Sequence, residues 1–68
     1  MQKVVVYRQK TGKHVACRYA NGQVTMKMGE PIFTVEAETA EAVSIAAREE
    51  AARLGITKVL GLGAVGGV

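Results

Sequence analysis

The sequence predicts an α+β fold: an antiparallel β-meander of about four strands, one α-helix packed on one face and a short final strand, in the order β-β-β-β-α-β. Two observations support this prediction. Two tight-turn signals, Asn21-Gly22 and Gly29-Glu30, separate runs in which apolar and polar residues alternate, a pattern typical of β-hairpins. From Thr39 to Gly55, apolar residues instead recur at helical spacing.

The first strand is expected over residues 3–10, where four consecutive residues are β-branched or aromatic. Thr11-Gly12 then forms a turn. If Lys10 pairs with Lys13, five apolar side chains share the core face. These are Val4, Val6, Val15, Cys17 and Tyr19, with Val5 and Tyr7 left on the outward face. A longer loop would exchange the two faces.

Two further hairpins are expected, and their registers agree. With Asn21-Gly22 in a type I′ turn, the pairs across the hairpin are Tyr19–Val24, Cys17–Met26 and Val15–Met28. With the second turn at Gly29-Glu30, the pairs are Met28–Pro31, Met26–Phe33 and Val24–Val35. Both registers place the same apolar residues on one face, and a slip of one residue would move them to the other face.

A helix is expected to begin after Thr39, a good N-cap residue, and to end before Gly55, the expected C′ stop. Its predicted sheet-facing stripe consists of Val43, Ala47, Ala51 and Leu54. Because this stripe is rich in alanine, the core depends on bulk from Met26, Met28 and Phe33. On the helix surface, Glu49 and Arg53 are spaced for an ion pair.

The largely apolar residues 56–62 are expected to form the final strand. The predicted domain covers residues 1–62, followed by a flexible glycine-rich tail over residues 63–68. Residues 61–66 match the G-x-G-x-x-G pattern, but the dinucleotide fingerprint needs a glycine turn that opens a helix. With no helix expected there, a flexible or edge-pairing tail is the better interpretation.

Length and composition limit the possible classes of protein. The 68 residues allow one small domain, which is marginally stable without further support. Cys17 is the only cysteine, so an internal disulfide is excluded and a cytoplasmic location is expected. Subunit association is the remaining source of stability, so we expect a homo-oligomer, in the simplest case a homodimer. Neither a signal peptide nor a membrane span is expected, because the run Val4-Val5-Val6 is far too short.

No catalytic, metal or cofactor site is expected. One histidine and one cysteine are too few for a zinc site. His14 and Cys17 lie three residues apart on one expected strand and therefore point to opposite faces. They cannot act together as base and nucleophile. The sequence favours a non-enzymatic binding module.

Charge is unevenly distributed along the chain. The net charge is +3, but residues 1–29 carry +6 without a single acid, and residues 30–68 carry −3. Such asymmetry favours a polyanionic partner, and we expect nucleic acid. The predicted phosphate-contacting residues are Arg8, Lys10, Lys13, Arg18 and Lys27, with Tyr7 as a stacking platform.

The alternative is a protein-interaction module: a small inhibitor or adaptor of the kind encoded by phages and mobile elements, or a subunit of an assembly. It would set the same basic residues against an acidic protein surface and would offer an open sheet edge to a partner strand. Ile45, roughly opposite the packed stripe of the helix, is the predicted partner contact. It fits equally well as a scattered apolar surface residue.

Overall fold

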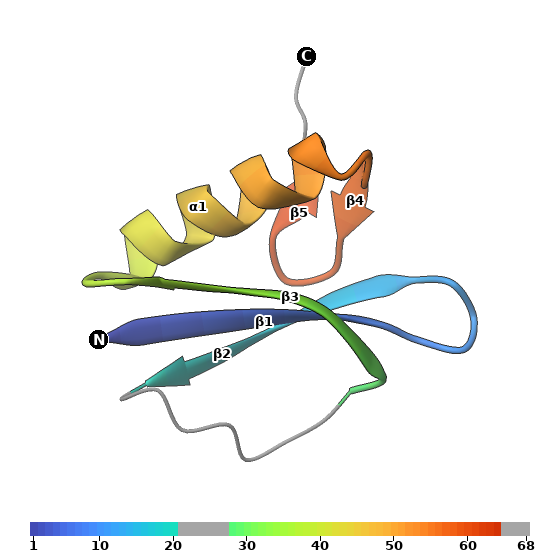
Figure 1. Ribbon diagram of the computed structural model, residues 1–68, viewed down its shortest axis with the longest axis horizontal. Helices are drawn as coiled ribbons and strands as arrows, with labels where there is room; N and C mark the ends of the chain where they lie inside the picture. The colour runs from blue at the N-terminus through green and yellow to red at the C-terminus, as the bar shows by residue number, and fades with distance from the viewer. Residues whose placement is uncertain (21–27, 65–68) are drawn as a thin grey trace.

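The computed structural model describes residues 1–20 and 28–64. These residues form a three-stranded antiparallel sheet, one helix lying across one face of the sheet, and a pair of very short strands (Figure 1). The elements are β1 (Gln2–Arg8), β2 (His14–Ala20), β3 (Glu30–Ala37), α1 (Ala40–Arg53), β4 (Lys58–Val59) and β5 (Gly63–Ala64). The predicted α+β class, with antiparallel strands followed by one helix and a short strand, is confirmed.

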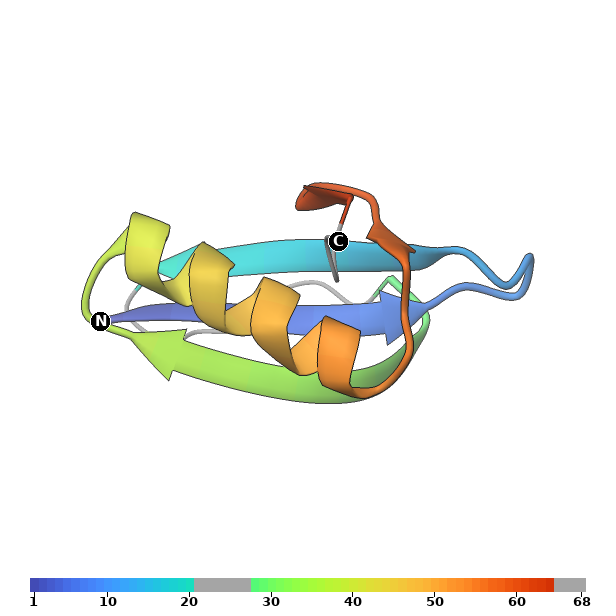
Figure 2. The ribbon, with the colours of Figure 1, turned by 90° about the horizontal axis from the view of Figure 1, so that it is seen from above.

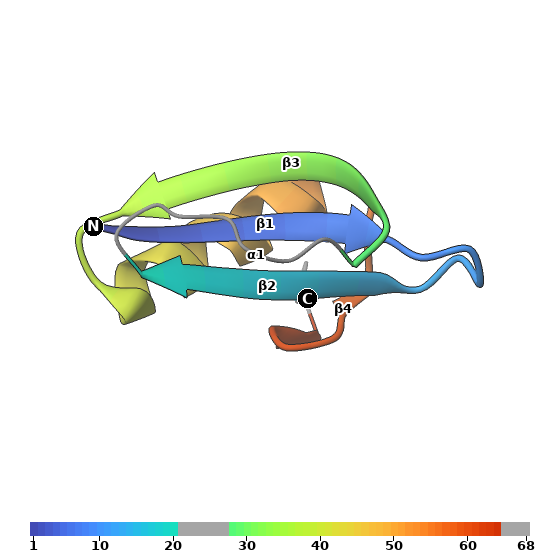
Figure 3. The ribbon, with the colours of Figure 1, turned by 90° about the horizontal axis from the view of Figure 1, so that it is seen from below.

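The central strand of the sheet is β1, and this corrects the predicted meander. The strand order is β2-β1-β3 (Figure 3), and β3 pairs with β1. The pair Met28–Pro31 predicted at the Gly29-Glu30 turn is wrong, because Met28 belongs to no strand and Pro31 pairs with Tyr7. The remaining pairs predicted at this turn and the hairpin predicted at Asn21-Gly22 involve residues 21–27 and lie outside the described residues. β1 is the central strand because its apolar run, residues 4–7, is buried and needs cover on both faces of the sheet.

The turn between β1 and β2 is one residue longer than the turn predicted from Lys10 pairing with Lys13. The Gln9 N–H donates to the Lys13 carbonyl at 2.8 Å, the Gly12 N–H donates to the Gln9 carbonyl at 2.9 Å, and Gly12 has φ +90°. This is a three-residue loop in which a left-handed glycine follows a type I turn. The longer loop exchanges the predicted faces, so Cys17 and Tyr19 lie on the face away from α1.

The main core lies between α1 and the sheet. Its buried members are Val4, Val6, Val43, Ala47, Ala51, Val59 and Leu62. Phe33 packs against this cluster as predicted, but Met28 packs on the opposite face, and Met26 lies outside the described residues. The bulk expected from methionine comes instead from Val59 and Leu62, which fold back beside the helix.

The face of the sheet away from α1 is also packed. Val5, Tyr7 and Tyr19 are 5%, 2% and 6% exposed, and Cys17 and Met28 pack against them. Tyr7 and Tyr19 come from neighbouring strands, and their side chains share a hydrogen bond. This hydrogen bond, followed by burial, raises the pKa of Tyr19 above its ordinary value of 10.0. The sheet face away from α1 therefore has an apolar centre.

The raised pKa of Tyr19 predicts a loss of stability in alkali. Since the folded state holds the phenol neutral, stability is fully present below the ordinary pKa of 10.0 and falls as the pH rises above it. The difference in tyrosinate absorbance between the unmodified protein and Tyr19→Phe follows the titration of Tyr19, and urea unfolding at each pH measures the stability. Tyr19→Phe is expected to flatten the alkaline loss. Titration of Tyr19 at its ordinary pKa in the folded protein would contradict this prediction.

Both ends of α1 form as predicted. The Thr39 hydroxyl accepts a hydrogen bond from the Ala42 N–H at 3.1 Å. At the other end, Gly55 has φ +81°, and the Ile56 N–H donates to the Ala51 carbonyl at 2.9 Å. With the Gly55 N–H donating to the helix as well, this is a Schellman motif.

The predicted sheet-facing stripe of α1 is correct except at its last position. Val43, Ala47 and Ala51 are buried, whereas Leu54 is 48% exposed. Leu54 is the C-cap, where the backbone leaves the helix, so its side chain no longer follows the helical stripe. No helix among the described residues is long and apolar enough to cross a membrane.

Residues 56–62 do not form the single strand that was predicted. β4 pairs antiparallel with β5 outside the main sheet, so Gly63 and Ala64, assigned from the sequence to the tail, are paired. Leu60 attaches this segment to β2: its carbonyl accepts from the Ala16 N–H and its N–H donates to the His14 carbonyl, both at 2.8 Å. Residues 65–68 lie outside the described residues.

Candidate nucleic-acid interface

The β1–β2 turn and the segment after α1 meet at one end of the molecule (Figure 2). β3 runs antiparallel to β1 and ends beside Gln2. The helix then returns along the sheet, so its C-terminal end and Lys58 reach the end where the turn projects. The fold therefore brings together cations that are far apart in the sequence.

Four exposed cations gather at this end. They are Arg8, Lys10, Lys13 and Lys58, and together they are called the basic end. Among the described residues, none of the four takes part in an ion pair. Glu30 lies opposite Arg8 in the strand register, and it is the nearest carboxylate in the pairing. The basic end therefore carries a net positive charge that is available to a ligand.

A second carboxylate near this end, Glu50, is already engaged. The Arg53 Nε donates to Glu50 Oε1 at 3.1 Å, and an Arg53 terminal nitrogen also contacts Glu50 Oε2. The guanidinium holds the pKa of Glu50 below its ordinary value. The predicted pair between Glu49 and Arg53 is thus replaced by a pair three residues apart.

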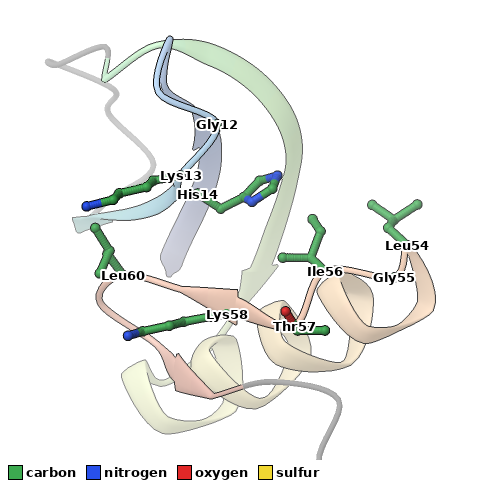
Figure 4. Close-up of a pocket in the computed structure, with 9 residues that line it drawn as sticks. All are labelled: Gly12, Lys13, His14, Leu54, Gly55, Ile56, Thr57, Lys58 and Leu60. Carbon is green, nitrogen blue, oxygen red and sulfur yellow. The ribbon is translucent and has the colours of Figure 1, made fainter.

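A pocket of about 600 Å³ opens beside the turn, on the side of the sheet that carries α1. Its lining residues are Gly12, Lys13, His14, Leu54, Gly55, Ile56, Thr57, Lys58 and Leu60. Figure 4 shows the side chains of Lys13 and Lys58 extending the same way, with Leu60 between them. The ring of His14 lies between this group and Ile56. Ammonium groups, a ring and aliphatic side chains thus border one space.

A smaller pocket of about 430 Å³ involves the same turn together with the start of β3. It is lined by Arg8, Gln9, Lys10, Gly12, Gly29 and Glu30. Gly12 borders both pockets. The turn therefore separates two concave surfaces, each of which has lysine at its edge.

The structure brings together only some of the predicted site residues. Arg8, Lys10 and Lys13 cluster as expected. Arg18 is exposed but lies four residues along β2 from His14, about 13 Å away at the rise of a strand. Tyr7 is buried in the packed face and presents no stacking surface. Lys27 lies outside the described residues.

Ile45 and Lys58 are both exposed. Ile45 is 45% exposed on α1, as expected for a residue opposite the packed stripe. Lys58 belongs to the basic end but was not among the predicted residues. Its position depends on the return of the chain after α1, and no motif around Lys58 signals this.

Among residues 1–20 and 28–64, no group of histidine, cysteine and carboxylate side chains is arranged to hold a metal ion. Cys17 packs in the face away from α1, whereas His14 lines the pocket beside α1. The arrangement suits binding of an anion by lysine and arginine. Comparisons of the chain with protein-family models, with curated proteins and with solved structures found no match.

Proposed function

We propose that this chain is a non-enzymatic module that binds nucleic acid through its basic end. The supporting observation is the convergence of Arg8, Lys10, Lys13 and Lys58 at one end, where they are exposed and make no ion pair with other described residues. Four cations that no described carboxylate neutralises can contact several phosphates of one backbone, whose negative charges are closely spaced. Phosphate contacts of this kind position a strand without reading its sequence.

The proposal predicts binding that weakens steeply with salt. With about four phosphate contacts, the logarithm of the association constant should fall with a slope of about −3 against the logarithm of salt concentration for a single strand. Affinity should then drop about 50-fold between about 50 mM and about 200 mM salt. Fluorescence polarisation with a labelled oligonucleotide of about 12 nucleotides measures this. No binding at the lower salt concentration, or an affinity that ignores salt, would contradict the proposal.

Protein interaction is the second candidate function, and the exposure of Ile45 and the outer edge of β3 favour it. Within the described residues, β3 pairs only with β1, so its other edge can accept a strand. Light scattering over a range of protein concentrations tests the simplest case, a homodimer. An Ile45→Glu variant should reduce any association. A monomer at all concentrations would leave the homodimer without support.

A further inference from the structure

The described residues offer few rings to a nucleobase. Tyr7 and Tyr19 are buried in the face away from α1, and Phe33 packs against the main core. His14 is the exception, because its half-buried ring lines the larger pocket. Histidine is among the side chains on which unstacked bases are held in protein–RNA complexes.

The surroundings of His14 suit a base and its flanking phosphates. Leu60 and Leu54 are 43% and 48% exposed and border the same pocket. Both side chains therefore present accessible aliphatic surface to the pocket. Lys13 and Lys58 stand on either side of Leu60 (Figure 4). The volume of about 600 Å³ lies in the range of pockets that enclose small organic ligands.

We infer that this pocket takes one unpaired base of the bound strand, stacked on the ring of His14 beside Leu60, while Lys13 and Lys58 hold the phosphates on either side. The inference rests on the proposed nucleic-acid binding and adds a preference to it. A duplex keeps its bases stacked and paired, so only a single strand can place a base here without unpairing. The chain therefore binds single strands in preference to duplexes.

The test distinguishes the contribution of the base to affinity from the contribution of the phosphate backbone. Fluorescence polarisation compares a labelled thymidine oligonucleotide with an abasic strand of the same length and the same number of phosphates. The protein should bind the thymidine strand about tenfold more tightly, a typical gain from one stacked base. His14→Ala should bind both strands equally, with an unchanged affinity for the abasic strand. His14→Phe should restore the preference because it keeps a ring at this position.

Each outcome bears on a different claim. Equal binding of both strands by the unmodified protein, or a preference that survives in His14→Ala, would overturn the base pocket and leave backbone binding intact. Failure to bind either strand at low salt would overturn the proposed function and the pocket together. Circular dichroism of the variants checks the fold, and folded variants are expected because His14 belongs to neither core cluster.

Discussion

Replacing Gly29 by alanine is expected to lower the free energy of unfolding by about 3 kcal/mol. Gly29 has φ +144°, and a Cβ placed on it would lie 2.5 Å from the carbonyl oxygen of Arg8. That oxygen belongs to the backbone of β1 and cannot move without disturbing the start of β3. Since small domains have only a few kcal/mol of stability, the loss should be plain in urea unfolding.

Gly12→Ala is the matched control. Gly12 also has a positive φ, +90°, but a Cβ there would meet no atom within 4 Å. Only the backbone strain remains, and it should cost about 1 kcal/mol. Equal losses in the two variants would show that the close approach of Gly29 to β1 contributes nothing.

Removing two charges from the basic end is expected to weaken nucleic-acid binding about 50-fold at about 50 mM salt. The double variant Lys13→Gln and Lys58→Gln removes two phosphate contacts and leaves both side chains long and polar. Both residues are exposed, and neither takes part in an ion pair within the described parts of the chain. Fluorescence polarisation with the same labelled oligonucleotide measures the loss.

The control for this variant changes two cations elsewhere. Lys3→Gln and Arg18→Gln lower the net charge by the same amount, from +3 to +1. Lys3 and Arg18 lie toward the other end of the sheet, where Lys3 contacts Glu36 at 3.9 Å. This control should bind nearly as well as the unmodified protein. A loss equal to that of the basic-end variant would mean that overall charge decides affinity.

The helix could be predicted from the sequence because its signals are local. Thr39 caps the first turn through its own hydroxyl, and Gly55 ends the last turn through its own backbone. Each signal acts within a few residues of its position. Neither depends on where the sheet lies.

The strand order could not be predicted from turn signals, which favour pairing between neighbours in the sequence. β3 pairs with β1 and not with β2, the strand that precedes it among the described residues. The faces of β2 depend on the length of the β1–β2 loop. The apolar run Val4-Val5-Val6-Tyr7 did contain the needed information. A strand buried on both faces is central, and its tyrosine is then unavailable for stacking.

The part of the candidate site that lies in the first hairpin could be predicted from the sequence. The part contributed by the segment after α1 could not. Arg8, Lys10 and Lys13 are neighbours of one turn, so their cluster follows from the hairpin alone. Lys58 joins them only because α1 returns along the sheet and Leu60 bonds to β2. The pocket that contains His14 depends on the same return of the chain.

The salt dependence of binding in the two double variants tests the central claim most directly. The unmodified protein and the Lys3/Arg18 variant should both show a slope of about −3, whereas the Lys13/Lys58 variant should show a slope reduced to about −1.5. That result would place the phosphate contacts at the basic end. Equal slopes in the two variants, or no binding by the unmodified protein at low salt, would contradict it.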